Sequence, residues 1–199
     1  NAMDGVTTGE NNTAIGYDAL TTTNTTGQAN SAVGSRSLED NTTGSHNTAV
    51  GYQAMQLNTT ASNNTAVGSG SLYDNTTGTR NTAVGAFAVE NNLSNDNTGV
   101  GYYALNANTT GIQNVAVGSQ ALDANTTASY GTAIGYGALG ANLTGANNTA
   151  VGHGTLAANT TGSENVAMGR VALAANTTGT NNIALGYGSL DANTTASYN

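Results

Sequence analysis

The strongest constraint on the fold is a short sequence repeat that occupies almost the whole chain. Its units read NTAVGxxALxxNTTGxx with small changes, as in NTAVGYQAMQLNTTASN over residues 47–63. A fixed period of this size is the signature of a solenoid, in which each unit buries a face against the next. Eleven units begin at Asn12, Asn30, Asn47, Asn64, Asn81, Asn97, Asn114, Gly131, Asn148, Asn165 and Asn182, and Asn199 opens a twelfth.

The pattern within a unit indicates short extended segments joined by turns, without the apolar spacing of a helix. The first unit has an extra residue within 21–23, and the fifth lacks one after 92–95, which marks these segments as loops. The sequence therefore predicts an all-β parallel solenoid of about eleven 17-residue coils over residues 12–199. Residues 4–11 are interpreted as a partial unit, and residues 1–3 as a cloning remnant ending in a start methionine.

Alternation along a strand predicts which positions of the unit share a face. Position 4 is always Val, Ile, Leu or Met, and position 2 is Thr, Ser, Val or Ile, so we expect positions 2 and 4 to face the interior together with the Leu of position 9. Position 3 would then point outward, yet it is uniformly small, so it is predicted to be covered by another subunit. This predicted subunit-interface face consists of Ala14, Ala32, Ala49, Ala66, Ala83, Gly99, Ala116, Ala133, Ala150, Ala167 and Ala184.

Two further positions are predicted to be structural. Position 5 is always Gly, which favours a bend with positive φ or a close backbone approach. Position 12 is always Asn, and coils stacked about 4.8 Å apart would align these amides into a hydrogen-bonded ladder. The predicted ladder consists of Asn24, Asn41, Asn58, Asn75, Asn92, Asn108, Asn125, Asn142, Asn159, Asn176 and Asn193.

Composition excludes several classes of function. The net charge is −8 and the only cations are three Arg, so the clustered basic residues that bind nucleic acid or anionic lipid are missing. There is no Cys, which removes disulfides and thiolate metal sites. No signal peptide or membrane-length apolar run is present. We expect no cofactor, no nucleic-acid partner and no direct membrane contact.

Catalytic and metal-binding residues are not expected either. His46 and His153 fall in different units and would lie about 30 Å apart at the cross-β spacing, so they cannot share a site in one chain. The acidic residues gather in turns without a calcium-loop spacing and are interpreted as solvent-facing charges. A convergent acid–base constellation is missing, so the chain is predicted not to be an enzyme.

Positions 6 and 7 vary most between units, which is typical of an exposed face. Phe87 and Tyr103 occupy position 7 of consecutive units, so their rings should stack, with Tyr102 and Arg80 nearby. Aromatic residues and Arg are common anchors of contact sites, so these four residues form a candidate contact patch. A stabilising ladder or subunit contact is the alternative interpretation.

Threonine pairs such as Thr59-Thr60 and Thr126-Thr127 raise the hypothesis of an ice- or surface-binding solenoid. Adjacent residues of an extended chain point to opposite faces, however, so such pairs do not encode a flat two-column array. The recurring Asn-x-Thr sequons arise from the repeat itself and are interpreted as turn motifs.

The motif NTAVG…AL…NTTG, and especially NVAVG at Asn114 and NVAMG at Asn165, resembles the head repeats of YadA-like trimeric autotransporter adhesins over about residues 5–199. The resemblance implies a left-handed β-roll, a homotrimer, an extracellular or cell-surface location, and attachment to a host surface or matrix component. Similar repeats occur in phage tail-fibre-like proteins, which are also trimeric. The units here are longer and no neck or coiled-coil stalk is present, so we expect a fragment of a longer fibre.

Overall fold

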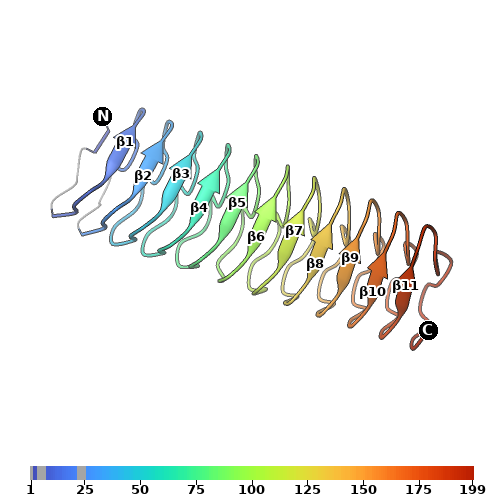
Figure 1. Cartoon of the computed structure of the whole chain (residues 1–199). Helices are drawn as coiled ribbons and strands as arrows, with labels where there is room; N and C mark the ends of the chain where they lie inside the picture. Colours follow the sequence, from blue (N-terminus) through green and yellow to red (C-terminus); the bar gives the residue numbers. More distant parts are fainter. Residues whose placement is uncertain (1, 4–7, 22–25) are drawn as a thin grey trace.

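The computed structural model describes residues 2–3, 8–21 and 26–199, and these form a β-solenoid with one short strand in each coil. The strands stand side by side in chain order along an elongated body (Figure 1). Their bounds are β1 Thr13–Ile15, β2 Ser31–Val33, β3 Thr48–Val50, β4 Thr65–Val67, β5 Thr82–Val84, β6 Thr98–Val100, β7 Val115–Val117, β8 Thr132–Ile134, β9 Thr149–Val151, β10 Val166–Met168 and β11 Ile183–Leu185. The predicted all-β parallel solenoid with a 17-residue repeat is confirmed.

Each strand pairs in parallel with the strand of the next coil, and equivalent repeat positions face each other. Ala49 lies opposite Ala66, for example, and Ala116 lies opposite Ala133. The missing residue of the fifth unit does not disturb this register, because Ala83 still lies opposite Gly99. The length difference is therefore absorbed outside the strands, on the turn side of the coil.

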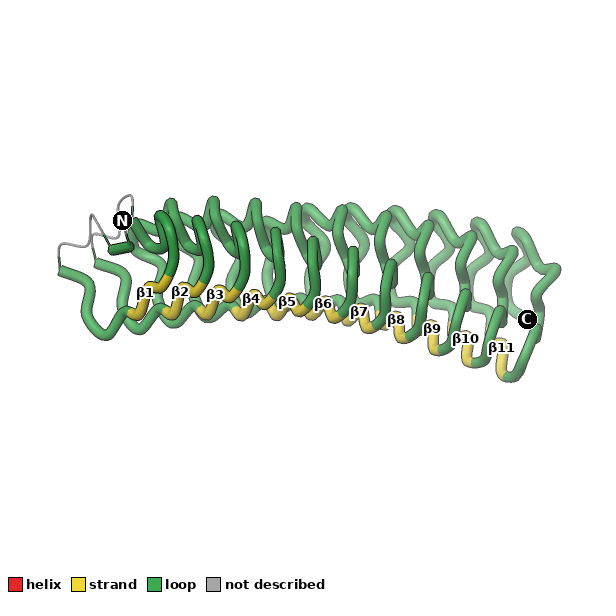
Figure 2. The backbone as a smooth tube through the Cα atoms, turned by 90° about the horizontal axis from the view of Figure 1, so that it is seen from above, coloured by secondary structure: helices red, strands yellow, loops and turns green. Residues whose placement is uncertain are grey.

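Hydrogen bonding between coils continues through the turns, although only three residues of each coil are strand. The Gly101 N–H donates to the Val84 carbonyl at 2.7 Å, and the Leu105 N–H donates to the Ala121 carbonyl at 2.9 Å. Figure 2 shows the strands along one side of the tube, with turns completing every coil. The backbone is thus tied along the axis on all sides of the coil, as buried peptide groups require.

The interior is filled by three positions of the unit. Position 3 supplies Ala, position 8 supplies Ala, Ser or Thr, and position 9 supplies Leu, Met or Val. The fully buried members of position 9 are Leu20, Leu38, Met55, Leu72, Val89, Leu105, Leu122, Leu139, Leu156 and Leu173. Together with the buried Ala they form one hydrophobic cluster that runs the length of the solenoid.

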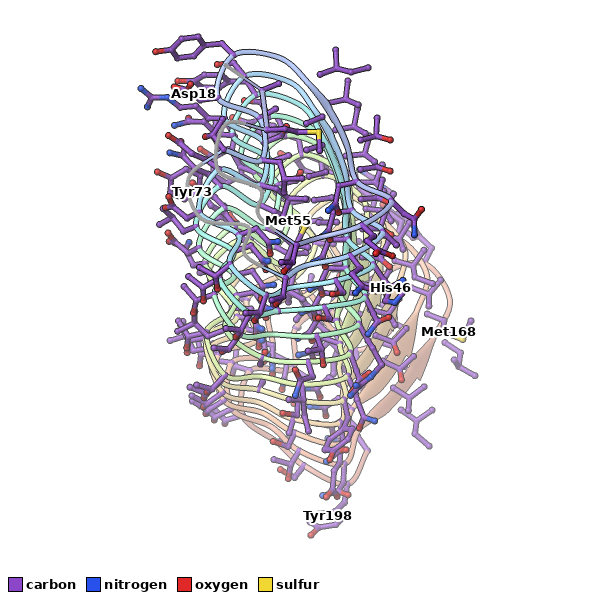
Figure 3. All side chains as sticks on the ribbon, turned by 90° about the vertical axis from the view of Figure 1, so that its left-hand side faces the viewer. Asp18, His46, Met55, Tyr73, Met168 and Tyr198 are labelled. Carbon is purple, nitrogen blue, oxygen red and sulfur yellow. The ribbon has the colours of Figure 1, made fainter. Side chains whose placement is uncertain are left out.

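The predicted orientation of the strand was wrong for positions 2, 3 and 4. Position 4 points outward, with Ile15, Ile134 and Leu185 exposed, whereas Ala116 at position 3 is 0% exposed. Figure 3 shows Met55 of position 9 inside the coil and Met168 of position 4 on its outside. The face predicted to be a subunit interface therefore points into the chain's own core. This correction applies to the whole set of Ala14, Ala32, Ala49, Ala66, Ala83, Gly99, Ala116, Ala133, Ala150, Ala167 and Ala184.

The physical reason is the narrowness of the coil, which leaves room at position 3 for about one methyl group. At Gly99, where that methyl is missing, an added Cβ would collide with Cγ2 of Val89 and lie 3.0 Å from the Ala104 carbonyl oxygen. Val89 is the only Val among the buried position 9 side chains, and it packs over the space left by Gly99. Small side chains at position 3 thus reflect interior crowding.

The turns rely on left-handed backbone at fixed positions. Positions 7, 9 and 17 adopt positive φ even where the residue is not Gly, as at Phe87 (55°), Leu105 (54°) and Tyr130 (61°). Position 5 reaches φ values such as 134° at Gly101. A Cβ there would lie 2.6 Å from the carbonyl carbon of Gly118 in the next coil, so the predicted bend and close approach at position 5 are confirmed.

The predicted asparagine ladder at position 12 is present over most of its length. Asn125 Nδ2 donates to Asn108 Oδ1 at 2.9 Å, and Asn159 Nδ2 donates to Asn142 Oδ1 at 2.8 Å. The chain of bonds runs from Asn92 to Asn193 and also joins Asn58 to Asn41. It is interrupted around Asn75, where the Oδ1 atoms of Asn58 and Asn75 find no donor among the described residues. Asn24 lies outside the described residues.

A second ladder, which sequence reasoning missed, is formed by the Asn of position 1. Its side-chain oxygen accepts from the backbone of the next coil, as in Asn114 N–H to Asn97 Oδ1 at 3.0 Å. Its amide nitrogen donates across the coil, as in Asn114 Nδ2 to the Ala128 carbonyl at 2.9 Å. Gly131 interrupts this ladder because it has no side chain to offer to Asn148.

Candidate functional site

The outward side of the strand column is a regular surface that runs through all eleven strands, and we call it the outer sheet face. It consists of the first and third residue of every strand, which are positions 2 and 4. Position 4 forms an unbroken apolar column: Ile15, Val33, Val50, Val67, Val84, Val100, Val117, Ile134, Val151, Met168 and Leu185. Position 2 forms the parallel column: Thr13, Ser31, Thr48, Thr65, Thr82, Thr98, Val115, Thr132, Thr149, Val166 and Ile183.

The outer sheet face is uncharged and accessible to solvent. Val67 and Val84 keep 37% of their surface exposed although neighbours crowd them along the axis, and Met168 keeps 46%. Eleven strands spaced about 4.8 Å apart make the face about 50 Å long, so its area is roughly 500 Å². The largest apolar patch on a typical monomeric protein covers about 300–600 Å² and is often functional, so the outer sheet face is a candidate binding surface.

Two columns of variable residues border the outer sheet face. The leading edge is position 17, two residues before each strand: Asn11, Ala29, His46, Asn63, Arg80, Asp96, Gln113, Tyr130, Asn147, Glu164 and Asn181. The trailing edge is position 6, two residues after each strand: Tyr17, Ser35, Tyr52, Ser69, Ala86, Tyr102, Ser119, Tyr136, His153, Arg170 and Tyr187. An apolar centre with a polar rim is the usual anatomy of a protein interface, and aromatic residues are enriched in such interfaces.

One strong ion pair lies on the leading edge. Arg80 Nε donates to Asp96 Oδ1 at 2.6 Å, and Arg80 Nη2 donates to Asp96 Oδ2 at 2.9 Å. The guanidinium therefore binds the carboxylate through two parallel hydrogen bonds. The hydrogen bond from Arg80 lowers the pKa of Asp96, and the same bond raises the pKa of Arg80. The pair links the coils that contain β5 and β6, because Arg80 precedes the short unit and Asp96 ends it.

The candidate contact patch is only partly assembled. Phe87 and Tyr103 are in contact with ring centroids 5.3 Å apart, but the rings are tilted by 40° and not stacked as predicted. Tyr102 lies edge-on to Tyr103 at 4.4 Å. Gly70 makes room for the Phe87 ring, since a Cβ there would lie 2.8 Å from it. Arg80 does not join this cluster, because it lies before β5 whereas the rings follow β5 and β6, and it is engaged by Asp96.

The two histidines stay far apart on the surface. His153 stacks on Tyr136 with centroids 5.3 Å apart, and Arg170 lies over the Tyr187 ring at 5.6 Å, both along the trailing edge. His46 is exposed on the leading edge. Within the described residues no three His, Cys, Asp or Glu side chains gather as a metal site, and no pocket opens on the surface.

The acidic residues of the turns lie on the side of the coil away from the outer sheet face, where Figure 3 places Asp18 and Tyr73. They are partly buried and less solvated than predicted. Burial raises the pKa of Asp74 and of Asp123. Burial also raises the pKa of Glu39, although Arg36 nearby opposes the shift. These carboxyls line a polar flank of the solenoid.

The Thr-Thr corner does not present two exposed columns. Thr59 is half-buried and its Oγ1 donates to the Thr76 carbonyl at 3.0 Å, whereas Thr60 is exposed. The preceding Asn58, which is the asparagine of the sequon, is fully buried in the ladder. Its side-chain Oδ1 and Nδ2 atoms are therefore inaccessible in the folded coil. The prediction that these pairs are turn motifs agrees with this arrangement.

Comparison with protein-family models, with curated proteins and with solved structures gives no match. Among the described residues, no helix has the length and apolar character needed to cross a membrane. The outer sheet face and its two edges are therefore the features from which function has to be argued.

Proposed function

We propose that the chain is a non-catalytic structural segment of a surface fibre, which assembles with further copies of itself through the outer sheet face. The observation that supports this proposal is the unbroken apolar column at position 4, which faces outward in all eleven coils of a single chain. With its two edges the face offers roughly 1,000 Å², judged from strand spacing and length, which is comparable to one side of a standard protein interface.

A homotrimer is the assembly that we propose. Three identical faces turned toward a common axis would bury the apolar columns and leave the acidic flanks in water, which closed symmetry allows without open-ended growth. The resemblance of the motifs to YadA-like adhesin heads supports the same number of chains. By that analogy the fibre would be displayed outside the cell and attach to a host surface or matrix component; a trimeric phage tail-fibre shaft is the alternative setting.

Sedimentation equilibrium tests the assembly directly. A single chain has a mass of 19.7 kDa, and a trimer has three times that mass. We expect the trimer mass for the native chain and the monomer mass for Val84→Asp/Val117→Asp, because charges on the outer sheet face cannot be buried unpaired. The matched control is Thr77→Asp/Thr127→Asp on the exposed turn corner, which should remain trimeric. A native chain that sediments as a monomer would refute the proposal.

The attachment function has its own test. The trimer would be applied to immobilised extracellular-matrix proteins and to host-cell surfaces, with the monomeric Val84→Asp/Val117→Asp variant as control. Saturable binding by the trimer supports an adhesin. If the trimer binds neither surface, the result favours the shaft of a fibre, in which the repeats act as a spacer.

A second candidate function is ice or solid-surface binding by the same outer sheet face. The observation that supports this function is the mostly Thr column of position 2, which runs beside the apolar column at one fixed spacing. This column is distinct from the Thr pairs at the turn corner. This function requires the face to be free, so it predicts a monomer with thermal hysteresis. Loss of hysteresis in Thr82→Lys/Thr98→Lys would support it.

A further inference from the structure

The proposed self-association leaves one question open, because eleven similar coils could pair in several registers. The apolar columns of positions 2 and 4 repeat every coil, so sliding one chain past another by one coil exchanges one Val for another. Residues that differ from coil to coil must therefore define the register. The variable residues beside the outer sheet face are those of the leading and trailing edges.

Few of these edge residues carry a fixed charge. On the leading edge they are Arg80, Asp96 and Glu164, and on the trailing edge the residue is Arg170. Arg80 and Asp96 already neutralise each other within the chain at 2.6 Å. Glu164 and Arg170 remain, and both belong to the coil that contains β10.

Glu164 and Arg170 are exposed and cannot reach each other in one chain. A largely extended segment of six residue steps that includes β10 separates them by up to about 20 Å, and the outward side chains of that strand stand between them. No ion pair or hydrogen bond of the Glu164 side chain is found among the described residues. Arg170 rests on the ring of Tyr187, which leaves its guanidinium without an acidic partner in the same part of the chain.

A ring of parallel chains would bring these two groups together. Rotation about an axis parallel to the solenoid places the leading edge of each face against the trailing edge of the next copy, at the same coil. In that arrangement Glu164 of one chain meets Arg170 of its neighbour. Two antiparallel faces would instead join like edges and reverse the order of the coils, so the opposite charges would be separated.

A second coil supports the same pairing of edges. Around β8 both edges carry an exposed tyrosine, Tyr130 on the leading edge and Tyr136 on the trailing edge. In-register parallel packing would bring the Tyr130 ring of one chain into contact with the Tyr136 ring of the next. Such aromatic pairs stabilise an interface.

We infer that the chains associate parallel and in register with a second copy of the same chain on each side, and that the Glu164–Arg170 pair between copies sets this register. The inference rests on the proposed self-association and specifies its geometry. Glu164 and Arg170 are the two oppositely charged edge residues that have no ion-pair partner within the described residues of one chain. The inferred assembly gives each of them a partner in a neighbouring copy.

The test is a double-mutant cycle on the dissociation constant of the assembly, measured by sedimentation equilibrium. Glu164→Arg and Arg170→Glu should each weaken association about tenfold, since every contact of the ring changes from attraction to repulsion. The swapped variant Glu164→Arg/Arg170→Glu should return to within about threefold of the native value. Residues this far apart in one chain should not couple, so such a recovery reports a contact between chains.

Two matched controls lie on the same leading edge. Gln113→Arg, three coils away, should change the dissociation constant less than about threefold. Asn181→Arg, in the next coil, detects a shifted register. If Asn181→Arg rather than Glu164→Arg couples to Arg170→Glu, the in-register assignment is wrong.

Mixing provides an independent readout. Glu164→Arg and isotope-labelled Arg170→Glu, combined in equal amounts, should form mixed assemblies in native mass spectrometry in excess of the statistical proportion. Random mixing together with an additive cycle, in a native chain that still associates, overturns the edge pairing and leaves the proposed function standing. A native chain that sediments at 19.7 kDa overturns both.

Discussion

The gap in the position 1 ladder at Gly131 predicts a substitution that should stabilise the protein. In neighbouring coils the side-chain oxygen of this position accepts from the next backbone N–H, as Asn148 Oδ1 does from Asn165 at 3.0 Å. Gly131 cannot do so, and no partner for the Asn148 N–H is found among the described residues, although Asn148 is fully buried. The side-chain Nδ2 of Asn148 donates to the Gly145 carbonyl at 3.0 Å and to the Gly162 carbonyl at 2.7 Å, so it does not satisfy the gap at the backbone.

Gly131→Asn should restore the missing bond. The φ of Gly131 lies outside the left-handed region, and an added Cβ would meet Asn114 Oδ1 at 3.0 Å and Leu122 Cδ1 at 3.4 Å, neighbours that the other coils accommodate. One net hydrogen bond contributes about 0.5–1.5 kcal/mol, and replacing Gly at a compatible site contributes about 0.4–1 kcal/mol. The expected gain is about 1–2 kcal/mol, or about 2–8 °C in Tm for a chain of this size.

Thermal unfolding followed by circular dichroism measures the gain, with Gly131→Ala as the matched control. Alanine keeps the effect on the unfolded chain but supplies no acceptor, so its Tm should rise by less than that of Gly131→Asn. Equal midpoints for the two variants would refute the ladder reasoning. A lower midpoint for both would show that the interior has no room for a Cβ at this position.

The remaining predictions concern the core, the bend and the carboxyls. Leu122→Ala should lower the free energy of unfolding by about 2.7–5.0 kcal/mol in chemical denaturation. Val117→Ala on the outer sheet face should lower it by less than about 0.5 kcal/mol in an isolated chain. Equal losses for the two variants would contradict the assigned orientation of the strand. Gly101→Ala should cost about 1–3 kcal/mol from backbone strain alone, and a neutral result in the same melts would exclude that strain. Because burial raises the folded-state pKa of Asp74 and Asp123, Tm should fall as pH rises from about 4 through their folded-state pKa values. Asp→Asn at both positions should reduce that slope to the part contributed by Glu39, whose pKa burial also raises.

The sequence was sufficient to predict the period, the parallel stacking and the bend at position 5. These features follow from invariance: Gly101 and its equivalents admit no other residue, and Asn125 and its equivalents bond to the same residue type in adjacent coils. The position 1 ladder could have been found by the same reasoning, since Asn114 and its equivalents recur as regularly as position 12. Its single exception, Gly131, hid the signal.

The orientation of the strand could not be predicted, because alternation defines two faces without saying which one is inside. Hydrophobicity favoured Val117 over Ala116 for the interior, and the structure reverses them. A coil with one three-residue strand has a narrow interior, which position 9 residues such as Leu122 nearly fill, so the larger strand side chain has to lie outside. The width of the coil, which decides the matter, depends on turn geometry that the composition does not reveal.

The aromatic patch illustrates a second limit of sequence reasoning. Repeat positions correctly placed Phe87 against Tyr103 in neighbouring coils. They could not place Arg80, because the strand separates position 17 from position 7 and Arg80 is engaged by Asp96. The repeat period predicts which residues of successive coils lie next to each other along the axis. Which residues of one coil lie next to each other depends on the path of the backbone around the coil.

The left-handed residues at positions 7, 9 and 17 have a consequence for how the solenoid forms. Leu105 and Tyr130 hold a backbone conformation that costs about 1–2 kcal/mol for each non-glycine residue, and a coil on its own has few contacts to offset that cost. The first coils should therefore be slow to nucleate. Once they exist, a finished coil offers its row of peptide groups as a template for the next repeat of the chain, so growth should proceed coil by coil and melting should start at the ends.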